Sequence, residues 1–292
     1  MNHTISDNFP FESRFLSVNG SDIHYIDEGK GDPILFLHGN PSSNYLWRNI
    51  IPYLTKLGRC IAPDLIGMGK SDKPNINYGF YDSYNYLETF IHRLNLKNIT
   101  LIVHDWGSGL GFHYTRQHPE NVKRIVFMEA VYKLLDLNSK PKKVQAMMTF
   151  MKFPITNWIL FGIANMFVKK MLPDMMIRKL TTKEFNIYKA PYKTIKSRKP
   201  VRVWPQEIAI NGKPEYMHKI ISEYHEFLKK SQIPKLCLYA SPGMLITEDE
   251  IPWIERNFPE TTCINIGEGL HFIQEDQPDN IGHSISNWLQ NI

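Results

Sequence analysis

The sequence predicts an α/β protein in which a mostly parallel sheet is interrupted by a long helical insert. Three observations carry this prediction. Short apolar runs alternate with helical segments up to about Met128, the alternation stops from about Val131 to Gly212, and strand-like runs return afterwards. Alternating strands and helices are typical of a doubly wound parallel sheet, and the helical stretch is most simply an insertion into it.

The first elements of the core are short strands. We expect strands at Arg14–Val18 and Ile23–Ile26, joined by the tight hairpin signal Asn19-Gly20. The run Pro33–Leu37 is apolar on both faces, which suits a strand in the middle of a parallel sheet. A further strand is expected at Arg59–Pro63.

The strand and helix rhythm then continues on both sides of the insert. Before it we expect helix Tyr84–Leu94, strand Ile99–His104, helix Ser108–His118 and strand Val122–Met128. After it we expect strands Pro234–Ala240 and Thr261–Ile266 and a last helix at Pro278–Leu289. This pattern predicts a core of residues 1–131 and 213–292, with a helical cap of residues 132–212 inserted after the sixth strand.

The composition argues against several classes of protein. The 292 residues are 42% hydrophobic and 22% charged, which is ordinary for a globular protein. The net charge is +5, but lysines and arginines are spread along the chain, so we expect no nucleic-acid partner. The three cysteines, Cys60, Cys237 and Cys263, form no C-x-x-C pair. A disulfide framework or a zinc site is therefore not expected, and neither is another metal or cofactor.

The sequence also carries no targeting signal that we can identify. Its first residues lack the basic region and apolar run of a signal peptide. It contains no uninterrupted run of about 18 apolar residues, the length that a spanning helix needs. We therefore expect a cytoplasmic protein that does not contact a membrane.

The segment around Asp105 has the pattern of a catalytic turn. The apolar run Ile99–Val103 leads directly into His104-Asp105-Trp106-Gly107-Ser108, and a helical pattern follows. A nucleophile on a strand-to-helix turn with small residues after it is the nucleophile elbow of α/β-hydrolases. The helix N-terminus favours an ionised carboxylate, as a nucleophilic Asp105 requires. The alternative is that Asp105 only caps the helix.

Two further residues complete a possible catalytic triad. His271 follows the last predicted strand, where this fold places its histidine. A histidine base needs an acid to fix its tautomer, and Glu129, at the end of an apolar strand, is our choice because a buried charge needs a partner. Glu248 and Asp249 are alternative acids, but they lie several residues beyond the strand Pro234–Ala240.

At this point the chain resembles the haloalkane dehalogenases over nearly its whole length. The resemblance lies in His38–Arg48, Ala62–Pro74, His104–Gly107 and Gly269–Asp276, and in Met171–Pro173, Arg178–Thr181, Tyr188–Pro191 and Val203–Glu207 of the insert. It implies an α/β-hydrolase fold, with a mostly parallel eight-stranded sheet flanked by helices and a helical cap. A glutamate after the sixth strand resembles the subfamily that uses Glu as the third triad member.

The resemblance also implies a reaction. Asp105 would displace halide from a halogenated alkane to form an ester, and water activated by His271 would release an alcohol, halide and a proton. The family's two halide-binding residues map to Asn40 and Trp106, whose N–H groups suit a departing anion. It implies a role in detoxification, no cofactor, and a monomer or homodimer.

The first half of the insert departs from the family pattern. Phe150, Phe167, Met175 and Leu245 are expected to line the substrate pocket, although they could instead pack the cap onto the core. The apolar stretch Phe153–Leu172 could also form a membrane-surface helix or a dimer contact, but Pro154 and packing of the cap argue against a membrane role.

Two other activities share this fold and its nucleophile. An epoxide hydrolase would use cap tyrosines to protonate the opened ring, and Tyr132, Tyr188 and Tyr192 are available. Asn40 and Trp106 argue against that reading. An oxygenase resembling the coelenterazine luciferases would share the same five site residues, and the sequence hardly separates it from a dehalogenase.

Overall fold

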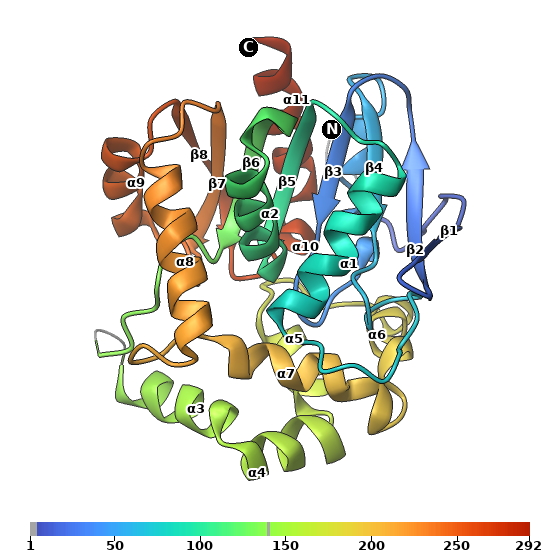
Figure 1. Ribbon diagram of the computed structural model, residues 1–292, viewed down its shortest axis with the longest axis vertical. Coiled ribbons are helices and arrows are strands. Elements are labelled where there is room, and N and C mark those ends of the chain that lie inside the picture. The colour runs from blue at the N-terminus through green and yellow to red at the C-terminus, as the bar shows by residue number, and fades with distance from the viewer. Residues whose placement is uncertain (1–4, 139–140) are drawn as a thin grey trace.

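Eight strands form a single sheet in the computed structural model, which describes residues 5–138 and 141–292 (Figure 1). The strand order is β1-β2-β4-β3-β5-β6-β7-β8; the β1–β2 and β2–β4 pairs are antiparallel, and all other neighbouring pairs are parallel. The strands are β1 Arg14–Val18, β2 Ser21–Glu28, β3 Pro33–Leu37, β4 Arg59–Pro63, β5 Ile99–Asp105, β6 Val122–Ala130, β7 Lys235–Pro242 and β8 Thr261–Gly269. The predicted fold class is confirmed.

Helices cover both faces of the sheet. Side chains of α1, α2, α8 and α9 share one apolar cluster, whereas α11 belongs to a second cluster with the turns after β3. In β5, Leu101 and Val103 face the first cluster and Ile102 faces the second, as alternation along a strand requires. These helices are α1 Phe80–Arg93, α2 Trp106–Gln117, α8 Glu215–Leu228, α9 Ile251–Asn257, α10 Ile273–Asp276 and α11 Pro278–Gln290.

Between β6 and α8 the described residues form helical segments and one isolated bridge, Ile210 with Lys213. The segments are α3 Lys142–Lys152, α4 Pro154–Asn157, η4 Trp158–Ile163, η5 Phe167–Met171, α5 Leu172–Asp174, α6 Thr182–Lys189, η6 Ala190–Tyr192, η7 Lys196–Arg198 and α7 Lys199–Glu207. They gather beneath the sheet in Figure 1, with α3 and α4 lowest. Across the described residues, no helix has the length and apolar character needed to cross a membrane.

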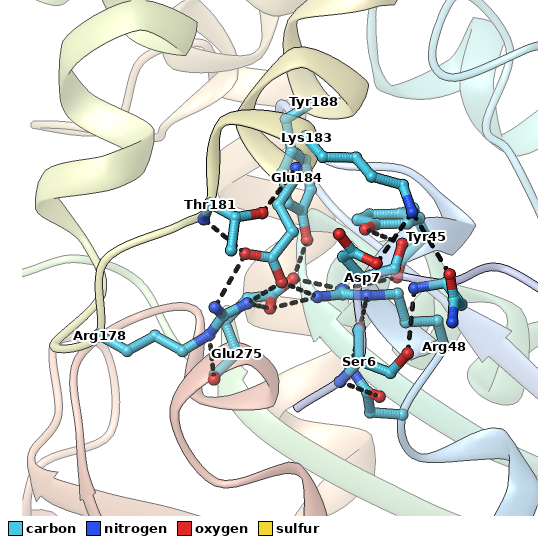
Figure 2. Close-up of polar contacts among 12 residues, drawn as sticks. Ser6, Asp7, Tyr45, Arg48, Arg178, Thr181, Lys183, Glu184, Tyr188 and Glu275 are labelled. Atoms are coloured by element: carbon cyan, nitrogen blue, oxygen red, sulfur yellow. Dashed lines mark hydrogen bonds and ion pairs between the residues drawn. The ribbon is translucent and has the colours of Figure 1, made fainter. Parts of the chain in front are cut away.

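A buried cluster of charged side chains joins these segments to the core (Figure 2). Arg48 donates to both carboxylate oxygens of Glu275 at 2.6 and 2.9 Å, and to Glu184 of α6 at 2.7 Å. Arg178 also binds Glu184 and Glu275, and the Tyr188 hydroxyl donates to Glu275. Two guanidinium groups therefore neutralise two buried carboxylates, as buried charges require.

Removing one charge from this cluster is expected to destabilise the fold. Arg48→Met should lower the free energy of unfolding by about 3–5 kcal/mol, because it leaves Glu184 and Glu275 buried with a single guanidinium. The matched control is Arg59→Met, since Arg59 pairs with Asp27 but is 34% exposed, and it should cost less than about 1 kcal/mol. Equilibrium unfolding in urea measures both, and equal losses would contradict this account.

Candidate active site

Asp105 lies on a tight turn between β5 and α2. Its backbone has φ 49° and ψ −131°, a conformation that residues other than glycine rarely adopt. Two neighbouring glycines leave room for this turn. A Cβ on Gly39 would lie 2.0 Å from Asp105 Oδ1, and one on Gly107 would lie 2.3 Å from the carbonyl oxygen of Leu37. The turn therefore depends on residues without side chains next to it.

The Asp105 carboxylate does not cap α2. Its side chain makes no capping hydrogen bond. Instead Oδ1 accepts from the backbone N–H of Asn40 at 2.7 Å, the Trp106 N–H also donates to the carboxylate, and Oδ2 lies 3.3 Å from Nε2 of His271. Burial opposes ionisation, but the hydrogen bond and charge of His271 outweigh it and hold the pKa of Asp105 below its usual value. The group is therefore an anion at neutral pH.

His271 follows β8 and lies between two carboxylates. Its Nδ1 is 3.1 Å from Oε2 of Glu129, and its Nε2 faces Asp105. Burial alone would lower the pKa of His271, but hydrogen bonds to Asp105 and Glu129 and the charges of both raise it to about 9. The imidazole is consequently protonated at neutral pH and lies against the ionised carboxylate of Asp105.

Glu129 at the end of β6 is fully buried and also has a positive φ of 42°. It accepts hydrogen bonds from three successive backbone N–H groups after β7: Met244 at 3.0 Å, Leu245 at 2.8 Å and Ile246 at 3.3 Å. These donors satisfy a buried carboxylate that would otherwise be costly. The loop after β7 has no acidic residue before Glu248. It contributes instead the backbone amides that bind Glu129 at the end of β6.

The other candidate acids have different partners. Glu248 accepts from Asn265 at 3.3 Å, and Asp249 accepts from the Thr247 hydroxyl at 2.5 Å. Neither makes a described contact with His271, in contrast to Glu129. The structure therefore brings Asp105, His271 and Glu129 together and leaves the two alternatives outside.

Two residues that support this arrangement were not identified from the sequence. His104, the residue before Asp105, has a buried ring whose Nε2 lies 2.8 Å from the carbonyl oxygen of His271. Burial lowers the pKa of His104 to about 3, so it is neutral and must donate from Nε2 to that carbonyl. The Ser108 hydroxyl donates to the Asp105 carbonyl at 2.5 Å and accepts from the Val131 N–H at 2.8 Å. These contacts fix the backbone on both sides of the site.

Asn40 and Trp106 lie beside Asp105 in the wall of one cavity. The Asn40 amide donates one hydrogen bond to the Val201 carbonyl at 3.2 Å, which leaves its second N–H for another acceptor. The Trp106 ring packs at 4.9 Å from that of Trp204 in α7. Both predicted halide-binding side chains therefore contact residues of α7.

The cavity has a volume of about 380 Å³ and an apolar, methionine-rich wall. Phe167, Met175 and Leu245 lie in this wall, at the positions expected from the sequence. The prediction for Phe150 is wrong, because its side chain is on the outer side of α3 and is 57% exposed. The six methionines of the wall are Met147, Met148, Met151, Met171, Met175 and Met244.

The sheet order, the elbow and a histidine after the last strand define an α/β-hydrolase. In agreement, the family model described as alpha/beta hydrolase fold matches residues 32–278. The chain is 38% identical to a haloalkane dehalogenase of Mesorhizobium japonicum over 95% of this chain and 91% of that one. It is 40% identical to a haloalkane dehalogenase of Sphingobium indicum over 97% of both chains.

Solved structures agree with these relatives. The haloalkane dehalogenase DbeA from Bradyrhizobium elkani superposes with a TM-score of 0.94 at 34% identity, over 96% of this chain and 98% of that one. The haloalkane dehalogenase DatA from Agrobacterium tumefaciens gives a TM-score of 0.91 at 30% identity over 96% of both chains. The chain therefore belongs to the haloalkane dehalogenases, hydrolases that act on carbon–halide bonds.

Neutralising Glu129, the predicted acid of the triad, is expected to impair catalysis. Glu129→Gln keeps the size of the side chain, but it replaces the carboxylate beside Nδ1 of His271 with an uncharged amide. Turnover of a bromoalkane should therefore fall by about 10²–10⁴-fold. The matched control is Glu248→Gln, which should retain turnover within about twofold because surface changes away from the site have small effects. Bromide release by purified variants measures both, and a larger loss in the Glu248 variant would contradict the assignment.

Proposed function

We propose that this dehalogenase hydrolyses halogenated alkanes through a covalent ester on Asp105. One observation carries the proposal. A buried, ionised carboxylate with one oxygen held by backbone N–H groups faces an apolar cavity, with a histidine on one side and two side-chain N–H donors on the other. Such an arrangement suits attack on carbon followed by hydrolysis.

In the first step Asp105 displaces the halide. Oδ2 attacks the carbon that bears the halogen, a carbon–oxygen bond forms, and the carbon–halogen bond breaks with its electron pair on the halide. The departing anion cannot be usefully protonated at neutral pH, so donors must stabilise it directly. The free N–H of Asn40 and the indole N–H of Trp106 take this role in the wall of the mostly apolar cavity.

In the second step water cleaves the ester. His271 takes a proton from water, and the resulting hydroxide attacks the carbonyl carbon of the ester on Asp105. Oδ1 then carries the negative charge, and the Asn40 and Trp106 backbone N–H groups that contact the carboxylate in the free enzyme stabilise it. The alcohol leaves with a proton, and Asp105 keeps one oxygen from water.

The charges explain how one histidine serves both steps. In the free site, the two carboxylates raise the pKa of His271 to about 9. Forming the ester removes the charge of Asp105, while burial and Glu129 stay in place. Because burial disfavours the cation, the pKa of His271 falls and its proton leaves. Formation of the ester thereby creates the neutral imidazole that the second step requires.

We propose residues 132–212 as a cap that selects the substrate, on a core of residues 1–131 and 213–292. The wall combines Phe167, Met175 and Leu245 with the other methionines, and flexible thioether side chains suit apolar chains of varied shape. The cavity size suits small halogenated alkanes. A cytoplasmic location and a role in detoxification stay predictions from the sequence.

The cap tyrosines give little support to epoxide opening. That reaction needs hydroxyl groups aimed at the substrate, but the Tyr188 hydroxyl binds Glu275 and Tyr192 packs within an apolar cluster of the cap. Tyr132 reaches the cavity wall, where its ring packs against Trp253 and Phe258. The geometry therefore favours dehalogenation over this alternative.

The wild-type chain should release bromide and acid from 1,2-dibromoethane or 1-bromobutane. Asp105→Ala should reduce this release by at least about 10⁴-fold, because it removes the nucleophile. Single-turnover hydrolysis in ¹⁸O-labelled water should place the label in the Asp105 carboxylate, which peptide mass spectrometry detects. Label in the alcohol alone would show direct attack by water and would overturn the covalent scheme.

Hydrolysis of the ester should become faster as pH rises, because only neutral His271 can accept the proton from water. Its midpoint should lie about one pH unit or more below the value of about 9 for the free site, since the ester has lost one neighbouring charge. Rapid mixing of enzyme with 1-bromobutane at several pH values measures the decay of the ester. His271→Gln is the control and should accumulate ester at every pH. A midpoint at or above pH 9 would contradict the coupling.

A further inference from the structure

The outer surface of α3, α4 and η4 is apolar. Eight of the fifteen exposed large hydrophobic side chains of the described residues lie here: Met147, Phe150, Phe153, Ile155, Trp158, Ile159, Ile163 and Met166. Ile155 is 63% exposed and Trp158 is 44% exposed. Single exposed apolar residues are common, but a gathered set marks an interaction site. We call these eight residues the apolar cap surface; Met147 lies at its edge, because it also lines the cavity.

The helices that carry the apolar cap surface lie at one end of the molecule. Figure 1 shows α3 and α4 at the end of the molecule opposite the C-terminus. The same helix α3 also supplies Val144, Met148 and Met151 to the cavity wall. An ordinary surface helix is apolar on one side only, whereas α3 is apolar toward the cavity and also toward the outside.

The cap segment is also strongly basic. Residues 132–212 hold sixteen lysines and arginines against four aspartates and glutamates, a net charge of +12. The remaining residues hold eighteen against twenty-five, a net charge of −7, and together they give the +5 of the whole chain. The net positive charge of the chain is therefore concentrated in this segment, although the basic residues themselves are spread along the sequence.

Several of these cations lie on the segments that carry the apolar cap surface or on the segments that follow them in the chain. Lys142 and Lys143 are exposed at the start of α3, and Lys169 and Lys170 are exposed on η5. Arg198 donates to the carbonyl groups of Gly162 and Ile163, at 2.8 and 3.1 Å, at the end of η4. Long basic side chains around exposed Trp, Phe and Ile residues are typical of surfaces that lie in a membrane interface.

We propose that the apolar cap surface and its surrounding cations bind the surface of an anionic phospholipid bilayer. The apolar side chains would enter the boundary between head groups and acyl chains, and the lysines would meet the lipid phosphates. A second copy of the chain fits less well, because a symmetric contact would place two strongly basic segments against each other. This proposal replaces the expectation from the sequence that the protein has no membrane contact.

Membrane binding would have a consequence for the substrate, and this consequence rests on the proposed function. Apolar halogenated alkanes partition into the acyl region of a bilayer, since water disfavours apolar surface. A bound cap would hold α3 between the bilayer and the cavity that contains Asp105. Binding to vesicles needs no turnover, so its test stays separate from the test of the reaction.

The test is sedimentation of the whole chain with vesicles of defined lipid. The protein should bind vesicles made of equal parts phosphatidylcholine and phosphatidylglycerol, and bind pure phosphatidylcholine at least about tenfold more weakly. Raising salt from about 0.1 M to about 0.5 M should weaken binding to the anionic vesicles, because salt screens exposed charges. Trp158→Ser combined with Ile159→Ser should remove most of the binding.

Two controls separate the apolar and electrostatic parts of the surface. Phe15→Ser combined with Tyr81→Ser changes two similarly exposed hydrophobic residues of the core, at 55% and 50% exposure, and should leave binding unchanged. Lys142→Gln combined with Lys143→Gln should weaken binding to anionic vesicles only. All three double variants should keep wild-type bromide release from 1,2-dibromoethane, which shows that they fold.

Three results would overturn the proposal. The first is that the protein does not sediment with anionic vesicles. The second is that the Phe15 and Tyr81 control loses as much vesicle binding as the Trp158 and Ile159 variant. The third is a concentration-dependent dimer that the Trp158 and Ile159 substitutions dissociate, in the absence of vesicle binding. The last result would assign the apolar cap surface to self-association instead. Analytical ultracentrifugation of the wild type and the double variants measures that outcome.

Discussion

One imidazole held between two buried carboxylates is the constraint on which the site depends. Asp105, Glu129 and His271 come from the ends of β5, β6 and β8, and all three are largely withdrawn from water. Two anions so close together are unfavourable unless donors surround them. Backbone N–H groups of Asn40 and Met244 to Ile246 meet this need, and His271 supplies the intervening positive charge. The neighbouring order of β5, β6, β7 and β8 makes these contacts possible.

The sequence predicted the sheet well because its strands are encoded locally. Arg14–Val18, Pro33–Leu37 and Arg59–Pro63 were predicted with the bounds that the structure has. The helix α8 at Glu215–Leu228 was not predicted, although Met217, Ile220, Ile221 and Tyr224 follow helical spacing and are buried. Charged residues such as Lys219 and Glu223 lie between them, so the helix is marked only by the spacing of its apolar residues and by no motif or adjoining apolar run.

The site itself was predictable only in part. The catalytic residue types follow from chemistry and chain order, so Asp105 and His271 could be proposed from the sequence alone. The amides that hold Glu129, and the contact from His104 to the His271 carbonyl, join residues more than 100 positions apart. No local pattern encodes such contacts. Phe150 was misplaced for a related reason, since both faces of α3 are apolar and hydrophobicity does not identify the inner one.

A single short segment connects the stability of the fold to the geometry of the site. Glu275 lies four residues after His271 and anchors the buried charge cluster between core and cap. Between these ends, the backbone N–H groups of His271 and Phe272 both donate to the Met175 carbonyl at 3.1 Å, and Met175 lines the cavity. The position of His271 and the position of the cavity wall are therefore set by the same contacts. A movement of Met175 would therefore also move His271, so the shape of the cavity and the position of the proposed base depend on each other.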